Sequence, residues 1–154
     1  FLNSKQISAK IKWPNDIMVS ELKISGILIE NKFVGSNFKH SIVGVGINVN
    51  QLDFNNLVAT SMKRQTSIKY SIIDLLDDFI FYLQNNEKLI YFDQQKELKR
   101  RYLSHLFAMG EERIFKSETQ TFSGKIIGVD EAGRLLVKSK GETFSFQNKE
   151  VQFL

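Results

Sequence analysis

Three short runs of apolar, β-branched residues follow one another near the start of the chain and predict neighbouring β-strands. They lie at 17–19, 24–29 and 42–49, and turn-forming residues separate them. We expect the first two runs to form a hairpin around Ser20 and Glu21. A polar connection at 37–40 should lead into the third strand, which extends over 40–51. The three strands together predict an antiparallel meander with one face buried.

A helical pattern follows the meander. From Ser71 onward, apolar residues recur at helical spacing and form one face: Ile72, Leu75, Leu76, Phe79, Ile80 and Leu83. Ser71 is suited to the N-cap, and Asp74 suits both the cap and the helix dipole. A shorter helical turn is expected to begin within 59–62. A second long helix should carry Tyr91, Leu98, Tyr102 and Leu106 on one side and expose the basic run at 99–101.

The last third of the chain has short alternating segments separated by turn signals. They predict strands at 113–116, 120–129, 134–139, 142–147 and 151–153. Gly133 and Gly141 suit the turns between them, where positive φ is needed. Five strands in so short a stretch indicate a small barrel or sandwich. We therefore predict an α+β fold with two domains, at 1–108 and 109–154.

Composition restricts the class of protein. The 154 residues are 42% hydrophobic and 25% charged, as in an ordinary globular protein. No apolar run is long enough to span a bilayer, and the first residues do not resemble a signal peptide. The chain has no Cys, which excludes disulfides and fits a reducing cytoplasm. A net charge of +4 is too small for a dedicated nucleic-acid binder.

Charged residues and glycines interrupt the predicted strands. Lys23 leads directly into an apolar strand, where it could neutralise a carboxylate and a phosphate together, or could protect a sheet edge from aggregation. Gly44 and Gly46 lie within a strand, where glycine indicates either close approach of a ligand or a bend. Asn48 and Asn50 alternate with apolar residues, so both amides should share one face.

The turn before the first strand offers further polar groups. Asp16 could bind a metal ion, orient Lys12 or cap the turn through backbone amides. Trp13 beside the single Pro could stack on a ligand or pack in a core. His40 and His105 have no neighbours in the sequence that would suggest a metal cage or a Ser-His-Asp site.

Taken together, three segments resemble the biotin–protein ligase family in order and spacing. They are KWPND at 12–16, KISGILIE at 23–30 and VGVGINVN at 43–50. This combination is more specific than any one of its parts. The segment at 59–61, the two helices and the small C-terminal β domain are also similar to that family, so the resemblance covers nearly the whole chain.

The resemblance implies an enzyme that makes biotinyl-AMP from biotin and Mg-ATP and then passes biotin to a lysine of a carboxylase carrier domain. It implies that Lys23 is catalytic and meets the biotin carboxylate and the α-phosphate. It also implies biotin contacts by Gly26, Leu28, Gly44 and Gly46, and nucleotide contacts by Lys12, Asn15, Asp16 and Asn48, with Asp16 near the Mg²⁺ ion.

The same resemblance implies the architecture and the partners. The first domain should be part of a mixed sheet like that of class II aminoacyl-tRNA synthetases, and the second should be an SH3-like barrel. The implied partners are biotin carboxyl carrier protein, biotin, ATP and a second copy in a homodimer, with no membrane and no nucleic acid. The family's Gly-Arg-rich loop lies upstream of KWPND, so these residues resemble a C-terminal portion and are expected to be inactive alone.

Two other interpretations remain open on the sequence alone. A lipoate–protein ligase shares the fold and a similar lysine, although the KWPND and GINVN segments favour biotin. A non-catalytic adaptor would use its β domain to hold a carrier protein, and Lys23 would then be an edge charge.

Overall fold

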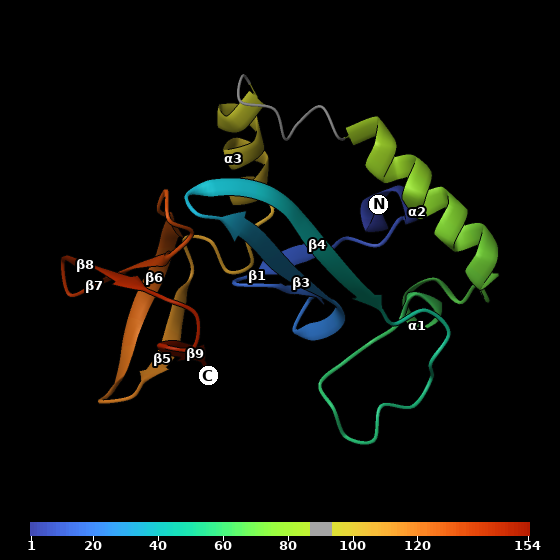
Figure 1. The fold of residues 1–154 in the computed structure, drawn as a ribbon. Helices are drawn as coiled ribbons and strands as arrows, with labels where there is room; N and C mark the ends of the chain where they lie inside the picture. The colour runs from blue at the N-terminus through green and yellow to red at the C-terminus, as the bar shows by residue number, and fades with distance from the viewer. Residues whose placement is uncertain (87–93) are drawn as a thin grey trace. The chain divides into compact units, whose positions relative to one another are not determined.

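The computed structural model describes residues 1–86 and 94–154, and within them the chain forms two compact units (Figure 1). The first unit comprises residues 1–10 and 15–86, and the second comprises 11–14 and 94–154. Both helices and antiparallel sheets are present, so the predicted α+β class is confirmed. The likenesses to a synthetase sheet and to an SH3-like barrel stay predictions.

The first unit is built around an antiparallel meander. Its elements are η1 (Leu2–Lys5), β2 (Asp16–Val19), β3 (Leu22–Val34), β4 (Asn37–Ile47), α1 (Met62–Thr66) and α2 (Ile72–Asn86), while β1 (Lys10–Lys12) spans the division between the units. β3 lies between β2 and β4 and pairs antiparallel with both. The predicted turn at Ser20 and Glu21 is confirmed, and Ser20 has a φ of 52°.

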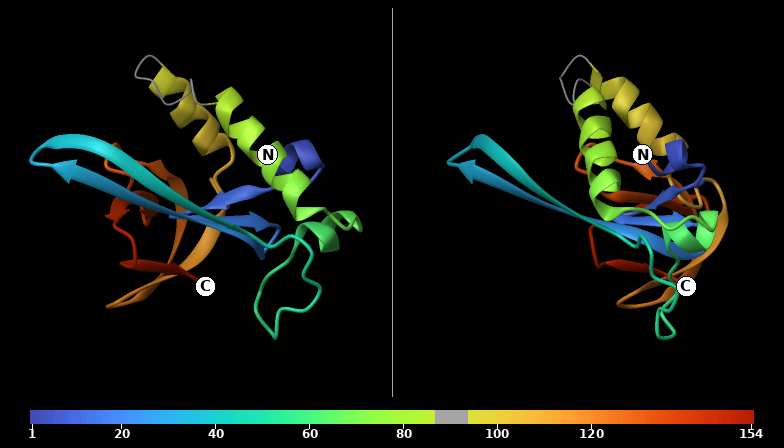
Figure 2. Two further views of the ribbon diagram at one scale, coloured as in Figure 1. Left: turned by 45° about the vertical axis from the view of Figure 1, so that its right-hand side comes forward. Right: turned by 90° about the vertical axis from the view of Figure 1, so that its right-hand side faces the viewer.

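The hairpin of β3 and β4 is longer than the pattern predicted (Figure 2). Residues 37–40 belong to β4, so the polar connection expected there is wrong, and the turn lies at Gly35, with a φ of 60°. Phe33 and Phe38 face each other near that turn with ring centroids 5.8 Å apart. The strand also ends at Ile47 rather than at residue 51. Every residue of 30–46 is exposed in the described structure, so burial of one face holds only for the inner half of β3.

The core of the first unit joins residues that are far apart in sequence. Ile7, Ile24, Met62 and Leu75 are buried together. Ser71 opens α2 as predicted, because its hydroxyl accepts a hydrogen bond from the Asp74 amide at 3.4 Å. Leu75 is the buried member of the predicted apolar face of α2, and most of its other large apolar residues stay exposed within the described part of the chain. The short helical turn predicted to begin within 59–62 is confirmed as α1, which begins at Met62.

The second unit is a five-stranded antiparallel sheet with α3 (Gln95–Ser104) before it. Its strands are β5 (Glu112–Ser117), β6 (Thr121–Val129), β7 (Leu135–Ser139), β8 (Glu142–Phe146) and β9 (Val151–Phe153), in the order β8-β7-β6-β5-β9. Each predicted strand is confirmed to within one residue at either end. Phe115, Ile126, Leu135 and Val137 are fully buried on one face of this sheet. The predicted turns at Gly133 and Gly141 have φ values of 79° and 90°.

The second unit includes the segment 11–14 because that segment is bonded to it. The Ile11 amide donates to the His105 carbonyl at 2.7 Å, and the Phe107 amide donates to the Ile11 carbonyl at 2.8 Å. Trp13 is buried, and its indole Nε1 donates to the Gly133 carbonyl at 2.8 Å, so Trp13 packs rather than presenting a free ring. The compact units therefore divide the chain elsewhere than at residues 108 and 109, and the predicted domain division stays a prediction.

The predicted basic run at 99–101 is exposed on α3, as expected. Tyr91, which was assigned to the same helix, lies outside the described residues. Among the helices that the structure describes, none has the length and apolar character needed to cross a membrane.

Candidate functional site

One row across the meander brings three of the predicted site residues together. Asp16 on β2 lies opposite Gly26 on β3, and Gly26 lies opposite Gly46 on β4. Two residues further along β3, Leu28 lies opposite Gly44. Because side chains alternate between faces along a strand, these positions share one face of the sheet. Sequence spacing and strand register thus assemble one continuous surface from three separate motifs.

A β-bulge places Lys23 on that same face. Ile17 pairs with Ser25, but the next residue of β2, Met18, pairs with Lys23, so Ile24 is an extra residue on β3. In a regular strand Lys23 would lie three positions from Gly26 and would point to the opposite face. The extra residue reverses this alternation. Ile24 is fully buried in the core, which fixes the bulge in place.

Lys23 and Asp16 form an ion pair above Gly26. The Lys23 ammonium lies 2.5 Å from Oδ1 of Asp16. Its Nζ and Cε atoms lie 3.4 Å from the place where a Cβ on Gly26 would be, so the absence of a side chain there gives the ammonium its room. The two side chains are 45% and 31% exposed. An exposed pair stabilises a fold by only about 0–1 kcal/mol, so this one is readily exchanged for a different anion.

The main chain of Lys23 is held by a loop from a distant part of the sequence. The Lys23 amide donates to the Val58 carbonyl at 3.1 Å, and the Thr60 amide donates to the Lys23 carbonyl at 2.9 Å. These two bonds form a parallel bridge between Lys23 and Ala59. Thr60 and Ser61 are completely buried. The position of the lysine therefore depends on the segment that leads into α1.

Asn48 completes this support. Its amide Nδ2 donates to the Thr60 carbonyl at 3.1 Å and lies 3.5 Å from the Lys23 carbonyl. Asn50 makes a separate pair of bonds: Nδ2 donates to the Tyr70 carbonyl at 2.8 Å, and Oδ1 accepts from the Tyr70 amide at 3.0 Å. Both residues follow the end of β4, so the prediction that their amides share one strand face is wrong. They brace loops.

The glycines of β4 leave the face open. A Cβ added to Gly46 would meet nothing within 4 Å, and one added to Gly44 would meet atoms of Leu28 at 3.9 Å or more. The strand pairing passes through both glycines without a shift in register, so neither glycine forms a β-bulge. Leu28 is 61% exposed beside them. Packing within the described chain therefore does not require glycine at these two positions. Gly26, Leu28, Gly44 and Gly46 together form an open apolar strip that runs from the ion pair along β3 and β4.

Two further predicted residues, Asn15 and Lys12, belong to different compact units. The Asn15 carbonyl accepts a hydrogen bond from the Ile27 amide at 2.8 Å, while the residue itself is exposed. Lys12 belongs to the second unit, where its Nζ lies 5.0 Å from the ring centroid of Phe153. The motif KWPND is therefore divided between the two compact units.

Among the described residues, Asp16 is the one acidic group that forms an ion pair with Lys23. No group of three or more acidic, His or Cys side chains suited to a metal ion occurs in the described ranges, 1–86 and 94–154. One carboxylate still fits Mg²⁺, which proteins commonly bind through one or two carboxylates together with substrate phosphates and water.

The supporting role of Val58 and Thr60 was missed in the sequence. The segment 59–61 was noted for its similarity to the biotin–protein ligase family, but nothing in its pattern shows that its backbone pairs with Lys23. Ser61 also has two local roles. Its hydroxyl donates to the Gln51 carbonyl at 2.6 Å and accepts from the Arg64 amide at 3.1 Å, which caps α1. A buried hydroxyl before a helix is the signal that could have indicated a braced loop.

Sequence comparison places this region among known proteins. A model of the Biotin/lipoate A/B protein ligase family matches residues 2–48. The bifunctional ligase/repressor BirA of Bacillus spizizenii is 28% identical over 139 residues, which are 87% of this chain and 43% of that protein. Biotin–protein ligase 1 of Arabidopsis thaliana, a chloroplast protein, is 51% identical over 43 residues. The chain spans less than half the length of these curated relatives.

Comparison with solved structures also finds biotin protein ligases. The biotin protein ligase of Aquifex aeolicus is 27% identical and has a TM-score of 0.77, over 99% of this chain and 68% of that chain. The same enzyme in complex with biotin and ATP has a TM-score of 0.76, over 99% of this chain and 65% of that chain. The fold therefore matches along nearly the whole described chain, and the predicted resemblance to biotin–protein ligases is confirmed.

Proposed function

We propose that this chain is part of a biotin–protein ligase that makes biotinyl-AMP from biotin and ATP and transfers biotin to a lysine of a carboxylase carrier domain. The observation that carries the proposal is the Lys23 ammonium, placed by a bulge beside Asp16 at the end of an open glycine strip. Similarity to biotin–protein ligases over most of the chain supports it. Because the chain spans 43% of its Bacillus relative, the activity is proposed for the protein that contains residues 1–154.

In the first step, an oxygen of the biotin carboxylate attacks the α-phosphorus of ATP. A new phosphorus–oxygen bond forms, and the bond to pyrophosphate breaks. The two reacting groups are both anions, so their approach requires a cation between them. Lys23 supplies that cation, and its Asp16 partner holds it until the substrates arrive. Such fixed positive charge is effective because it is already in place when charge develops at phosphorus.

The open strip beside the ion pair supplies the binding surface. We propose that biotin lies along Gly26, Leu28, Gly44 and Gly46, where missing side chains permit close approach to the backbone. Asp16 would provide one ligand of a Mg²⁺ ion that otherwise binds phosphate oxygens and water, and that ion would neutralise phosphate charge. Lys12, Asn15 and Asn48 are proposed as groups on the nucleotide side, with Asn48 acting through its support of Lys23.

In the second step, the deprotonated amine of the carrier lysine attacks the carbonyl carbon of the mixed anhydride. An amide bond forms, AMP leaves, and the amine loses its proton. Positioning accounts for much of the rate in a reaction between two bound partners. Biotin carboxyl carrier protein is the proposed partner.

We further propose the finer architecture that the sequence predicted. The first unit would be part of a sheet like that of class II synthetases, and the second would be an SH3-like barrel in a domain at 109–154. A homodimer and a cytoplasmic location also stay proposals.

The proposal is tested by replacing Lys23 in the protein that contains this chain. Lys23→Ala should lower biotin-dependent ATP–pyrophosphate exchange by about 10²–10³-fold, since a charge aimed at the reacting centre is lost. Circular dichroism should show an unchanged fold, because the side chain is half-exposed. Lys32→Ala, at an exposed position of the same strand, is the matched control. Equal exchange rates in the two variants would exclude the catalytic role of Lys23.

Two alternatives give different results. A lipoate–protein ligase would bind lipoate rather than biotin in a calorimetric titration, and the family match alone includes both kinds of enzyme. The relatives whose names include biotin, from Arabidopsis thaliana and Aquifex aeolicus, favour biotin as the substrate. A carrier-binding adaptor would still bind a carrier domain after Lys23→Ala and would release no pyrophosphate in either form.

A further inference from the structure

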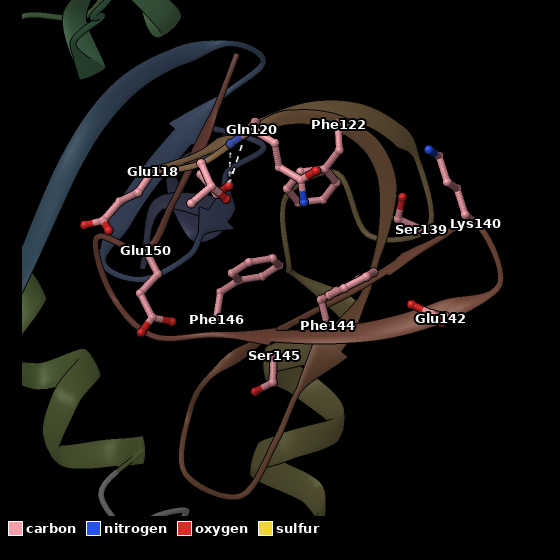
Figure 3. A pocket seen from close by; sticks show the side chains of 12 residues that line it. Glu118, Gln120, Phe122, Ser139, Lys140, Glu142, Phe144, Ser145, Phe146 and Glu150 are labelled. Carbon is pink, nitrogen blue, oxygen red and sulfur yellow. Dashed lines mark hydrogen bonds between the residues drawn. The ribbon is translucent and has the colours of Figure 1, made fainter.

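A second concave site lies in the C-terminal sheet, wholly within the second unit. Phe122, Phe144 and Phe146 line it (Figure 3). The Phe122 ring is stacked near Phe146, with centroids 5.8 Å apart, and lies 6.3 Å from Phe144. Phe144 and Phe146 are 6.4 Å apart. The cavity has a volume of about 540 Å³, which is in the range of ligand pockets.

This aromatic cluster continues the buried face of the sheet without being covered. Phe115 stacks on Phe122 with centroids 5.6 Å apart and is fully buried. Val137, opposite Phe144 on β7, is fully buried as well. Phe144 nevertheless remains 37% exposed. The core beneath is therefore complete, and an exposed aromatic surface remains at its mouth.

The rim of the pocket is acidic. Glu118, Glu142 and Glu150 line the pocket around the rings, and among the described residues Lys140 is the one basic residue that lines it. Glu118 and Glu150 lie at one end in Figure 3, and Glu142 and Lys140 lie at the other. The whole chain carries a net charge of +4, so this local excess of carboxylates has the opposite sign to the molecule. At physiological salt charges act over about 8 Å, so the carboxylates that line the pocket contribute directly to the potential inside it.

A strand edge runs beside the pocket. β8 ends the order β8-β7-β6-β5-β9, and it pairs on one side with β7. Within the described residues no strand pairs with its other side. An exposed edge of this kind can receive an extended peptide through main-chain hydrogen bonds, and pockets for alternate side chains then give specificity.

We propose that this pocket binds an extended peptide segment of another protein in which arginine or lysine alternates with apolar residues. A cationic side chain would lie over the phenylalanine faces, where the ring quadrupole attracts it, between the carboxylates of Glu118 and Glu142. The apolar side chains would cover Phe144. The residues involved all lie in 117–150, so the proposal does not depend on the function proposed for Lys23.

Fluorescence anisotropy with two short labelled peptides tests this. One alternates arginine with valine, and the other carries glutamate in place of arginine. The protein that contains residues 1–154 should bind the arginine peptide at least about tenfold more tightly, although the net charge of these 154 residues favours the glutamate peptide. Equal binding of the two peptides, or tighter binding of the glutamate peptide, would overturn the proposal.

Matched variants locate the binding. Glu118→Gln and Glu142→Gln should each weaken binding of the arginine peptide, while Glu131→Gln, an exposed carboxylate in another turn of the same unit, should leave it unchanged. Glu150 is not replaced in this test, because its carboxylate accepts a hydrogen bond from the Gln147 amide and so supports a turn. Phe144→Ala should abolish binding, with Phe81→Ala on α2 as its control.

The carboxylate variants decide the matter if Phe144→Ala proves unstable. Loss of binding that is the same in Glu118→Gln, Glu142→Gln and Glu131→Gln would show a general charge effect and refute the site. Analytical sedimentation then tests whether the protein self-associates through this pocket. If the protein self-associates through Phe144 and the arginine peptide does not compete, the pocket holds a second copy and the proposal is wrong.

Discussion

Gly26 and Gly46 lie directly opposite each other on β3 and β4, so that the sheet has two adjacent positions without side chains beside the Lys23 ammonium. Nothing in the first unit approaches the vacant position at Gly46. A glycine inside a strand lowers stability relative to a residue with a side chain by about 0.5–1 kcal/mol. The arrangement therefore carries a cost in stability, and the proposed gain is access for a flat ligand.

Filling this position should separate binding from stability. Gly46→Val should leave the fold intact or slightly stabilise it, because a β-branched residue suits a strand and meets no neighbour. Under the proposed function, the Kd for biotin should rise by about tenfold or more, measured by calorimetry. Ser41→Val, on the same strand and exposed, is the control. Unchanged affinity in the Gly46 variant would remove the strip from the biotin site.

Asn48 and Asn50 offer a matched pair for testing how Lys23 is positioned. Each variant, Asn48→Ala and Asn50→Ala, should lower the free energy of unfolding by about 1 kcal/mol, because each loses hydrogen bonds to the main chain. Only Asn48→Ala should also reduce kcat for adenylation, since only Asn48 contacts the segment that holds Lys23. Stopped-flow and steady-state kinetics measure this. A change confined to the KM for ATP would instead indicate direct contact with the nucleotide.

Gly124 differs from Gly46 because the packing around Gly124 leaves no room for a side chain. A Cβ at this position would lie 2.7 Å from Cγ1 of Val137 and 3.0 Å from the Lys138 carbonyl. Gly124→Ala should therefore destabilise the second unit by about 1–3 kcal/mol, as overpacking of a core does. Gly46→Ala should be close to neutral in the same urea titration. Equal stabilities of the two variants would contradict the packing of β6 against β7.

The charge cluster on α3 gives a prediction about pH. Hydrogen bonds from Arg100 and Arg101 hold the pKa of the Glu97 carboxyl at about 2, below its ordinary value of 4.5. A carboxyl whose pKa is lowered in the folded state contributes stability above its unfolded pKa. That contribution is lost as the pH falls from 4.5 toward 2.

Nuclear magnetic resonance titration of the Glu97 side chain should show this low midpoint. Helix content measured by circular dichroism should fall over the same range of pH. Glu97→Gln should remove this component of the pH dependence. A midpoint near 4.5 would show that the two arginine contacts do not persist in solution.

The five strands of the second unit were predicted almost completely, and the reason is local. Its strands alternate regularly, and glycine marks the turns that require positive φ, so each boundary depends on a few adjacent residues. The hairpin of β3 and β4 was predicted less well. Lys39 and His40 resembled a loop because both faces of the strand are exposed there, which leaves no apolar alternation to detect.

The candidate site was predicted by residue type rather than by geometry. Motif spacing identified Lys23, Asp16 and Gly46, but their meeting on one face depends on the extra residue at Ile24. A buried isoleucine in a bulge looks the same in sequence as one in a regular strand. The bonds between Lys23 and the loop at Val58 join residues far apart in the chain, and no local pattern encodes them.

The bulge at Ile24 also limits which deletions and substitutions the segment from Leu22 to Gly26 can accept over evolutionary time. Removing one residue between Leu22 and Gly26 would restore regular alternation and turn the ammonium away from Asp16, whatever amino acids remained. Exchanges of one apolar residue for another would be far milder. Length, more than the identity of most side chains, is the property that this segment has least freedom to change.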